Sequence, residues 1–317
     1  MEHGQVSKEI AKGLLALQER IKAADIPPSK LDETLNIATW NIREFGKAKR
    51  SEAAIHYIAE ILGQFDIVSI VELQQDLTHL GHVLKILGPY WRAIYSDVTP
   101  DKAGDYERIA LVYDKRAVVF NGLAAEALAP RVKQGNDYFA PITWWHAPYI
   151  ASFRAGNYDF VVVIAHIRWG KGLAGRKKEL QLLADWVDAR RKTAHTEDLD
   201  YIVMGDFNIP GTDDALFEAV TSRGLQIPKA LRGLSHGTNL ERDKRYDQIL
   251  QYANYDNSFT DNGGVLDFFI DESTIPELFP GGMSKTAFTF EMSDHLPLWM
   301  QVNIDISGQQ LQQIIQG

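Results

Sequence analysis

Residues 201–208 read Tyr-Ile-Val-Met-Gly-Asp-Phe-Asn, an apolar run that ends abruptly in polar residues. The first four residues suit a buried β-strand. Gly205, Asp206 and Asn208 follow where that strand would end, and these residue types also favour turns. Taken alone, the stretch fits an ordinary loop as well as a functional site, so the rest of the chain has to distinguish the two.

Five more apolar runs have polar side chains at one end. Asn41 follows 35–40, Glu72 follows 67–71, His166 follows 160–165, Asp247 precedes 248–251, and Ser293-Asp294-His295 comes shortly before 298–304. If the last two strands run antiparallel to the others, all six polar sites meet at one edge of the sheets. A single polar residue after a strand is usually a loop residue, but six in this arrangement predict one shared site.

Strand and helix patterns predict one large α+β domain. Strands rich in Val, Ile, Phe and Tyr are expected at 35–40, 67–71, 109–113, 149–153, 160–165, 201–204, 248–251, 265–270 and 298–304. Helices are expected at 51–62, 77–87, 176–192 and 213–220, the last with Thr212 as its N-cap. Because no linker interrupts residues 35–306, we expect them to form a single domain, followed by a C-terminal tail at 307–317.

Residues 1–34 are predicted to form an N-terminal helical extension. Ile10, Leu14, Leu17 and Ile21 recur at helical spacing, and Pro27-Pro28 ends the pattern. We expect the apolar side of this helix to pack on the main domain.

The composition excludes several kinds of chemistry. The 317 residues include 33 Lys and Arg, 42 Asp and Glu and no Cys, for a net charge of −9. Without cysteine there is no disulfide, thiolate zinc site, iron–sulfur cluster or cysteine nucleophile. The longest apolar run, 160–165, is far too short to span a membrane. At face value we expect a soluble cytoplasmic monomer, or a secreted one if a leader has been removed.

The residue types at the strand ends suit a hard divalent cation. Glu72, Asp206 and Asp294 supply carboxylates, while Asn41 and Asn208 supply amides. Mg²⁺ and Mn²⁺ prefer oxygen ligands and keep waters while they bind phosphates. A structural Ca²⁺ is a further option, because residues 255–294 carry eight acidic residues and one Lys.

Two histidines complete the chemistry that this site predicts. His166 and His295 are suited to act as acid and base, and Glu107 and Asp247 are available to orient their rings. Carboxylates around a hard cation, combined with paired histidines, describe metal-assisted hydrolysis of a phosphodiester.

Seven stretches resemble the endonuclease/exonuclease/phosphatase superfamily. They occur in the family's order at 39–43 (TWNIR), 70–74 (IVELQ), 106–110 (YERIA), 165–166 (AH), 204–208 (MGDFN), 246–249 (YDQI) and 293–297 (SDHLP). The resemblance implies a four-layer α/β/β/α sandwich with two packed mixed β-sheets. Glu107 together with His166 resembles the deoxyribonuclease I-like branch. Gln74 and the segment His146-Ala147-Pro148 stand where that branch tends to have DNA-contacting arginines.

The resemblance also implies roles for the oxygen-bearing residues. Glu72 would bind the catalytic cation, with Asn41 nearby on metal or phosphate and Asp294 in the shell around the metal. Asp206 and Asn208 would position the attacking water and the scissile phosphate.

For the histidines, the resemblance implies two different roles. His295, paired with Asp247, would act as base or phosphate contact. His166, paired with Glu107, would help to protonate the leaving oxygen.

Positive residues cluster beside these motifs in spite of the negative total. Residues 166–192 carry eight Lys or Arg against three acidic residues. We expect phosphate contacts from Arg43, Arg108, Arg168 and Lys171, and base stacking or wedging from Trp169.

The leading hypothesis is therefore a divalent-metal-dependent phosphodiester hydrolase, in particular a DNA endonuclease with low sequence specificity that binds DNA through its backbone phosphates. One alternative is a sphingomyelinase-like phosphodiesterase of phospholipid head groups, which would need exposed apolar loops. Residues 138–145 are the candidate for such a loop, although core burial is the preferred interpretation of that stretch. A second alternative is an inactive binding scaffold.

Overall fold

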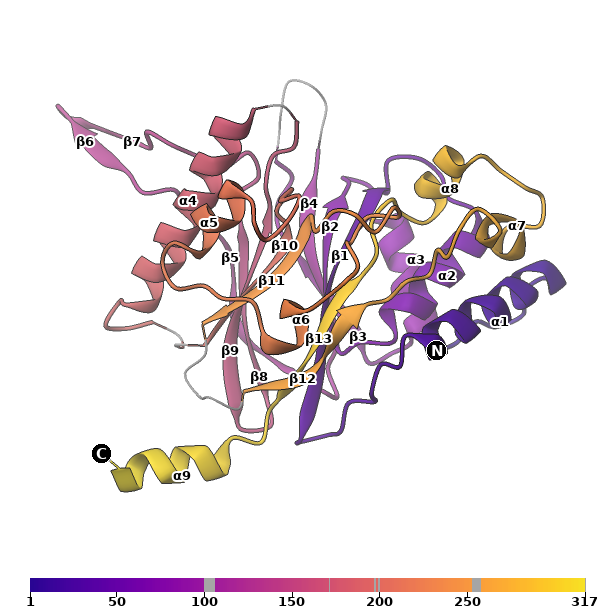
Figure 1. Cartoon of the computed structure of the whole chain (residues 1–317), viewed down its shortest axis with the longest axis horizontal. Coiled ribbons are helices and arrows are strands. Elements are labelled where there is room, and N and C mark those ends of the chain that lie inside the picture. The colour runs from indigo at the N-terminus through magenta and orange to yellow at the C-terminus, as the bar shows by residue number, and fades with distance from the viewer. Residues whose placement is uncertain (100–105, 171, 197, 199, 253–257, 317) are drawn as a thin grey trace.

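Two mixed β-sheets pack face to face and helices cover both outer faces (Figure 1). The computed structural model describes residues 1–317 except 100–105, 171, 197, 199, 253–257 and 317. This arrangement confirms the predicted four-layer α/β/β/α sandwich. No helix within the described ranges is both long and apolar enough to cross a membrane.

The first sheet has six strands in the order β12-β13-β1-β2-β4-β3. Their bounds are β1 Thr34–Phe45, β2 Ile67–Leu73, β3 Trp91–Tyr95, β4 Arg108–Asp114, β12 Phe259–Val265 and β13 Leu298–Asn303. β1 and β2 are parallel, whereas β13 runs antiparallel to β1. The ends of β1 and β2 and the start of β13 therefore lie at one edge of this sheet.

The second sheet has five strands in the order β11-β10-β9-β8-β5. Their bounds are β5 Val119–Glu126, β8 Tyr149–Ala155, β9 Tyr158–His166, β10 Tyr201–Asp206 and β11 Asp247–Tyr252. β9 and β10 are parallel, and β11 is antiparallel to β10. The predicted strand directions are therefore confirmed in both sheets, and the six polar sites share the upper edge of the sandwich in Figure 1.

Helices of unequal length form the two outer layers. Their bounds are α1 Lys8–Ala23, α2 Glu52–Leu62, α3 Thr78–Leu87, α4 Leu173–Arg191, α5 Ala215–Thr221, α6 Lys229–Arg232, α7 Thr274–Leu278, α8 Lys285–Glu291 and α9 Ser307–Gln316. The helices α1, α2 and α3 cover the first sheet, while α4 and α5 cover the second. The extension predicted at 1–34 contributes α1, which packs against α2 and α7, and the predicted tail at 307–317 contains α9.

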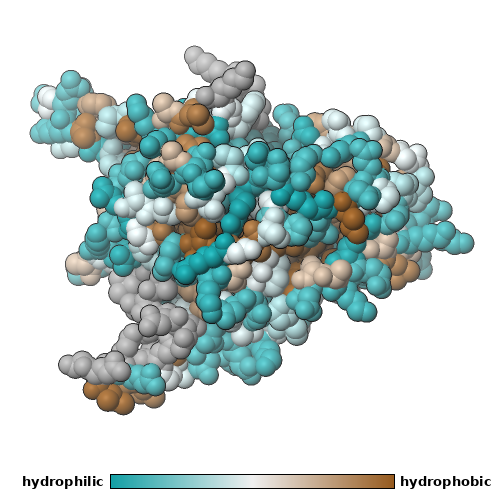
Figure 2. Space-filling model, in the orientation of Figure 1, coloured by the Kyte–Doolittle hydropathy of each residue, from teal (hydrophilic) through white to brown (hydrophobic). Residues whose placement is uncertain are grey.

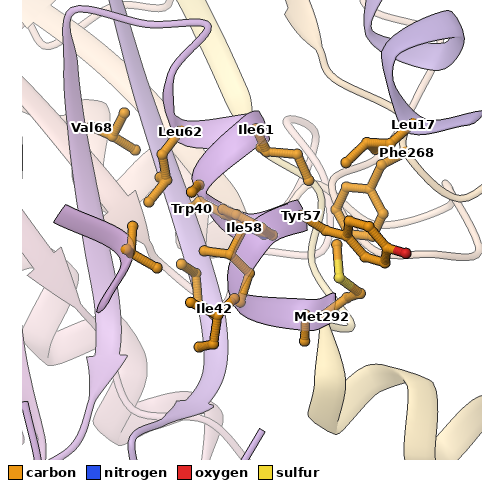
Figure 3. Packing of buried hydrophobic residues seen from close by; sticks show 14 of the residues in the cluster. Leu17, Trp40, Ile42, Tyr57, Ile58, Ile61, Leu62, Val68, Phe268 and Met292 are labelled. Carbon is orange, nitrogen blue, oxygen red and sulfur yellow. The ribbon is translucent and has the colours of Figure 1, made fainter. Parts of the chain in front are cut away.

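Apolar side chains fill the space between the first sheet and its helices (Figure 3). Trp40 on β1 and Ile58 on α2 are fully buried, as is Leu17 on α1. The Tyr57 hydroxyl donates to the carbonyl of Leu278 (2.7 Å), which ties α2 to α7. Burial of each such large side chain stabilises the fold by roughly 2–3 kcal/mol, so this layer holds β1 rigidly beneath the upper edge.

The strand predicted at 265–270 is wrong beyond its first residue. The observed strand β12 ends at Val265, and the following residues are irregular although Leu266 and Phe268 are buried. Asp267 accepts a hydrogen bond from the backbone N of Phe269 (3.1 Å), and the Arg242 guanidinium donates to backbone carbonyls of this segment. The apolar pattern thus indicated burial correctly, but local side-chain hydrogen bonds replace the strand pairing.

Other differences concern edges and caps. The strands β3 and β5 were not predicted, because edge strands with one exposed side lack the continuous apolar pattern of buried strands. The cap of α5 is Asp214, which accepts from the backbone N of Leu216 (2.7 Å), rather than Thr212. The burial preferred for residues 138–145 is also wrong for most of them, since Tyr138 and Trp145 are exposed and Trp144 is buried.

Gly205 is expected to be essential for the pairing of β9 with β10. Its φ is +137°, and an added Cβ would lie 2.0 Å from the carbonyl oxygen of Ala165 on β9. Because both the backbone conformation and the close approach exclude a side chain, Gly205→Ala should lower the free energy of unfolding by about 3 kcal/mol. Urea denaturation measures this loss.

The matched control for this substitution is Gly81→Ala. Gly81 lies in α3 with open space around its Cα, so alanine should raise the free energy of unfolding by about 1 kcal/mol. Equal stabilities for Gly205→Ala and the wild type would contradict the proposed constraint.

Candidate active site at the upper edge of the sandwich

The side chain of Asn41 lies between the two sheets at their upper edge. Its Nδ2 donates to Glu72 Oε1 (2.9 Å) on β2 and to Asp206 Oδ2 (3.0 Å) on β10. Asn41 is 1% exposed, and its Oδ1 has no hydrogen-bond partner within the described part of the chain. The amide nitrogen therefore holds two carboxylates, while the amide oxygen stays available as a ligand.

Glu72 stands near the end of β2 in a left-handed backbone conformation, with φ of 61°. Its Oε2 accepts a hydrogen bond from the backbone N of Glu44 (2.8 Å). Burial raises the pKa of Glu72, an effect that the charge of His166 and the Asn41 hydrogen bond only partly offset. A bound cation would stabilise this partly buried carboxylate in its charged form.

The turn after β10 is fixed by its own side chains. Asp206 Oδ1 accepts from the backbone N of Asn208 (2.8 Å), and Asn208 Nδ2 donates to the carbonyl of Ile167 (2.8 Å). Asn208 has a φ of 51°, a conformation that Asn tolerates better than most residues. Arg176 on α4 donates to the carbonyl of Asn208 (2.6 Å), so the turn is also anchored to the helical layer.

His295 forms one of two buried histidine–carboxylate pairs. Its Nδ1 lies 2.7 Å from Asp247 Oδ2, and its Nε2 lies 3.8 Å from Asp206 Oδ2. Burial opposes a charge on the ring, but Asp247 and Asp206 outweigh it and raise the pKa of His295 to about 10. The ring is therefore positively charged at neutral pH, with its Nε2 on the Asp206 side.

His166 forms the second pair, with Glu107 at the start of β4. His166 Nδ1 lies 2.9 Å from Glu107 Oε2, and both residues are less than 9% exposed. Burial disfavours the imidazolium, yet the hydrogen bond and charge of Glu107 raise the pKa of His166 to about 9. The charge of Asp206 helps to raise the pKa of both histidines, so the two pairs are coupled electrostatically through this carboxylate.

His146 joins the second pair, and the sequence analysis gave it no role in the chemistry. Its Nε2 lies 3.5 Å from Glu107 Oε2, and its ring stacks on that of His166 with centroids 5.0 Å apart and planes 4° apart. Imidazole lone pairs lie in the ring plane, so two stacked parallel rings do not converge on one metal ion. The cluster is therefore better described as two imidazoles beside one carboxylate; its only sequence signal was the altered segment 146–148.

Ser293 is a second residue that sequence reasoning left without a role. Its hydroxyl donates to the carbonyl of Asn41 (2.7 Å) and accepts from the backbone N of His295 (3.0 Å). The indole of Trp40 donates to the carbonyl of His295 (2.9 Å). These bonds seat the segment before β13 on β1, which explains why serine precedes Asp294 and His295 in the motif.

Arg43 and Asp294 lie beside one another on the α8 side of the edge. Their nearest side-chain atoms are 3.9 Å apart, and the Asp294 side chain is 45% exposed. Arg43 Nη1 donates to Thr289 Oγ1 (2.6 Å), and its guanidinium lies 3.9 Å from the ring centroid of Phe290. Asp294 is thus more open to solvent than Glu72, and Arg43 is held in place before any ligand arrives.

The other residues predicted to contact substrate differ in whether their side chains already have partners within the protein. Arg108 Nη1 donates to the carbonyl of Ser96 (2.8 Å), and Arg168 pairs with the buried Glu179 on α4 (3.0 Å). Trp169 is 76% exposed. Lys171 lies outside the described residues. The two arginines therefore have local partners with which a phosphate would have to compete, whereas the Trp169 ring faces solvent.

The oxygen ligands around Asn41 fit a hard divalent cation. Glu72 supplies a partly buried carboxylate and Asn41 an unpaired amide oxygen, a set that Mg²⁺ or Mn²⁺ would complete with waters and substrate oxygens. The buried cluster of Asp206, Asp247 and His295 includes an imidazole that is already paired, which suits Mg²⁺ less well.

A two-sheet sandwich with paired histidines, carboxylates and an amide at one edge defines a hydrolase of the phosphoester-cleaving class. The model of the Endonuclease/Exonuclease/phosphatase family matches residues 38–270, and the chain belongs to that family. Its sequence is also similar to those of proteins named deoxyribonuclease.

Individual relatives show how far these similarities extend. A protein named deoxyribonuclease from Thioalkalivibrio sp. (strain K90mix) is 25% identical over 286 residues, which cover 86% of this chain and 72% of the relative. Human deoxyribonuclease-1 is 30% identical over 186 residues, 55% of this chain and 61% of that protein.

Solved structures resemble the fold at lower identity. The human Nocturnin catalytic domain with bound sulfate has a TM-score of 0.57 at 15% identity, covering 86% of this chain and 95% of that one. A mannosyl-6-phosphatase from Bacteroides thetaiotaomicron VPI-5482 has a TM-score of 0.51 at 17% identity, covering 84% and 99%. Proteins with different names thus share the sandwich, so the fold alone does not identify the substrate.

The pairing of Glu107 with His166 predicts a pH signature in the metal-free protein. NMR titration should show His166 losing its proton near pH 9, and Glu107→Gln should lower that pKa because the buried ring loses its counter-charge. The raised pKa stabilises the folded state fully below about pH 6.5 and ceases to do so as pH rises through about 9. Glu107→Gln should therefore cost more unfolding free energy at about pH 6 than at about pH 10.

His56 provides an internal reference for this titration. Burial and the neighbouring His3 lower its pKa, so its resonance should move at lower pH than that of His166 in both proteins. A wild-type His166 that titrates at the ordinary value for histidine would contradict the pairing.

Proposed function

We propose that the chain is a divalent-metal-dependent DNA endonuclease with low sequence specificity. The observation that carries the proposal is that the charge of Asp206 acts on both buried histidine–carboxylate pairs, while Asp206 shares the Asn41 amide with Glu72. This arrangement offers an acid, anion contacts and oxygen ligands for a cation within one site. Each contributes to the cleavage of a phosphodiester.

The metal in this proposal is Mg²⁺ or Mn²⁺, bound by Glu72 and by the amide oxygen of Asn41, with Asp294 nearby. When bound, the cation neutralises charge on the phosphate oxygens. The raised pKa of Glu72 supports this assignment.

In the proposed reaction, Asp206 accepts the proton of the attacking water, and Asn208 keeps the turn that presents it. His295, positively charged at neutral pH through Asp247 and Asp206, contacts a phosphate oxygen. His166 is charged as well and donates its proton to the leaving oxygen, while Glu107 holds the other side of its ring. The high pKa of His295 favours a phosphate contact over a role as base.

The choice of DNA rests on the deoxyribonuclease names of the relatives and on the cations near the edge. Arg43, Arg108 and Arg168 suit backbone phosphates, which carry no sequence information, so cleavage would have low specificity. Lys171 is assigned the same role from sequence alone.

A phospholipid head-group phosphodiesterase is the second candidate. The observation in its favour is the exposure of Tyr138, Phe139, Ile142 and Trp145, which gives the chain the apolar loop that such an activity needs. An inactive scaffold is less favoured, because both histidine–carboxylate pairs are intact.

The nuclease proposal predicts nicking of supercoiled plasmid in the presence of Mg²⁺, which chelation should abolish. His166→Ala should reduce the rate by about 10²–10⁴-fold, because the leaving oxygen loses its proton donor. His82→Ala, at an exposed histidine of α3, should cleave like the wild type.

Two results would overturn the nuclease proposal. One is the absence of nicking over a wide range of enzyme concentration with both Mg²⁺ and Mn²⁺. The other is release of choline phosphate from sphingomyelin in the same preparations without cleavage of DNA, which would support the second candidate.

The metal assignment predicts that Glu72→Gln weakens Mn²⁺ binding at least tenfold, as measured by electron paramagnetic resonance of free Mn²⁺. The matched control is Glu52→Gln, at a carboxylate with a side chain 74% exposed on α2, which should leave binding unchanged. Wild-type affinity in Glu72→Gln would remove Glu72 from the metal site.

A further inference from the structure

An exposed set of aromatic and cationic side chains extends from the active site onto a projecting hairpin. We call it the aromatic surface, and it consists of Lys133, Tyr138, Phe139, Trp145, Arg168 and Trp169. The ring-bearing residues are 62% exposed at Tyr138, 43% at Phe139, 47% at Trp145 and 76% at Trp169. Large aromatic side chains gathered at this exposure usually mark a binding surface.

Cations in this surface lie over the aromatic rings. The guanidinium of Arg168 is 5.4 Å from the ring centroid of Trp145, and Lys133 Nζ is 5.9 Å from that of Tyr138. The carboxylate of Glu179, which is 1% exposed, accepts hydrogen bonds from the backbone N of both Trp145 and Arg168. The first of these cation–ring pairs is therefore held in a fixed arrangement by the core.

The surface is continuous with the proposed acid of the reaction. The rings of Trp145 and His146 are 6.5 Å apart, and His146 stacks on His166 at 5.0 Å. Trp169 follows His166 by three residues on the loop after β9. A strand whose scissile phosphate lies at His166 would therefore reach Trp145 and Trp169 with its neighbouring nucleotides.

The hairpin itself lacks a partner within the described structure. It consists of β6 (Val132–Gln134) and β7 (Asp137–Phe139), and every residue from 131 to 139 is exposed. Figure 1 shows it projecting from the body, and Figure 2 shows hydrophobic atoms among hydrophilic ones on this projection. An isolated two-stranded hairpin is marginally stable in water, so a bound partner would stabilise it.

The hairpin's turn argues against a membrane as that partner. Residues 134–137 read Gln-Gly-Asn-Asp, so the outermost part is polar and ends in an acid, while the aromatic rings come after it. Insertion into a lipid bilayer would bury that polar turn first, and the burial of its polar groups costs free energy. A nucleic-acid strand lying along the hairpin would instead meet both rings and cations, the combination found where unpaired bases stack.

We propose that the aromatic surface binds an unpaired strand of nucleic acid, with bases stacked on its rings and phosphates beside Arg168 and Lys133. The inference rests on the proposed function, because it assigns the substrate class of that same site. Bases in a duplex have their faces covered by neighbouring base pairs, whereas unpaired bases leave them free for Trp169 and Trp145. The enzyme should then prefer single-stranded or locally melted substrates.

Binding without cleavage tests this proposal. Fluorescence anisotropy with a dye-labelled oligothymidine of about 20 nucleotides and with a duplex of equal length, both in chelator, should give tighter binding to the single strand. Trp169→Ala should weaken single-strand binding about tenfold, and Trp169→Phe should restore most of it because a ring remains. Trp169 is exposed, so its removal leaves the core intact.

The matched control is Tyr90→Ala. Tyr90 is 47% exposed and lies under Arg116 at 4.6 Å, a similar cation–ring pair at the far end of β4 from the active site. It should bind the oligothymidine like the wild type. Equal loss in Tyr90→Ala and Trp169→Ala would overturn the assignment of the surface.

Two further outcomes would also overturn the proposal. One is equal affinity for single strand and duplex that Trp169→Ala does not change. The other is binding to phosphatidylcholine vesicles that Tyr138→Ala abolishes while oligothymidine does not bind. Because the assay contains chelator, it measures binding apart from cleavage. Strand binding by a protein that, with Mg²⁺ or Mn²⁺, cleaves neither plasmid nor single-stranded DNA would refute the nuclease proposal separately.

Discussion

The side-chain amide of Asn41 is the contact on which the arrangement of the site depends. Its nitrogen reaches Glu72 on the first sheet and Asp206 on the second, so it joins the two sheets through carboxylates that would otherwise repel one another. Hydrogen bonds to charged acceptors stabilise by roughly 1.5–3 kcal/mol each when buried. The backbone carbonyl of Asn41 accepts a hydrogen bond from the Ser293 hydroxyl, and that hydroxyl accepts one from the backbone N of His295. One residue thus sets both the spacing of the sheets and the position of the segment that carries His295.

Charge at the edge comes from protonated histidines more than from free arginines. Arg168 is paired with Glu179, and Arg43 lies near Asp294, so neither is an isolated cation. His166 and His295 instead gain charge because buried carboxylates raise their pKa values. A chain with a net charge of −9 can therefore present an anion-binding site that is small, buried and dependent on its internal partners. The overall charge predicts weak bulk attraction to nucleic acid, but it contains no information on this local field.

The strand ends could be predicted from sequence because one physical rule governs them. A change from apolar to polar residues marks the edge of a sheet, and parallel strands reach the same edge; this located Asn41, Glu72, His166 and Asp206. Contacts made only in three dimensions could not be predicted in that way. His146 meets Glu107 through a loop whose path no local pattern fixes, and the segment after Val265 stays buried through hydrogen bonds from Arg242 instead of strand pairing. The exposure of Tyr138 was missed for a related reason, since an aromatic stretch looks alike in sequence whether it enters a core or projects from it.

The place of β13 has a consequence for how the protein is made. This strand lies between β12 and β1 and is preceded by His295, although it is synthesised after every other strand. As a nascent chain emerges, β1 and β2 can pair early, but the first sheet lacks the strand that joins β12 to it. Until the segment before β13 is made, the carbonyl of Asn41 lacks the hydrogen bond from Ser293, and Asp247 lacks its pairing with the imidazole of His295. The candidate site is thus assembled by the same step that closes the sheet, so a ribosome-bound intermediate would carry most of the fold before this site is complete.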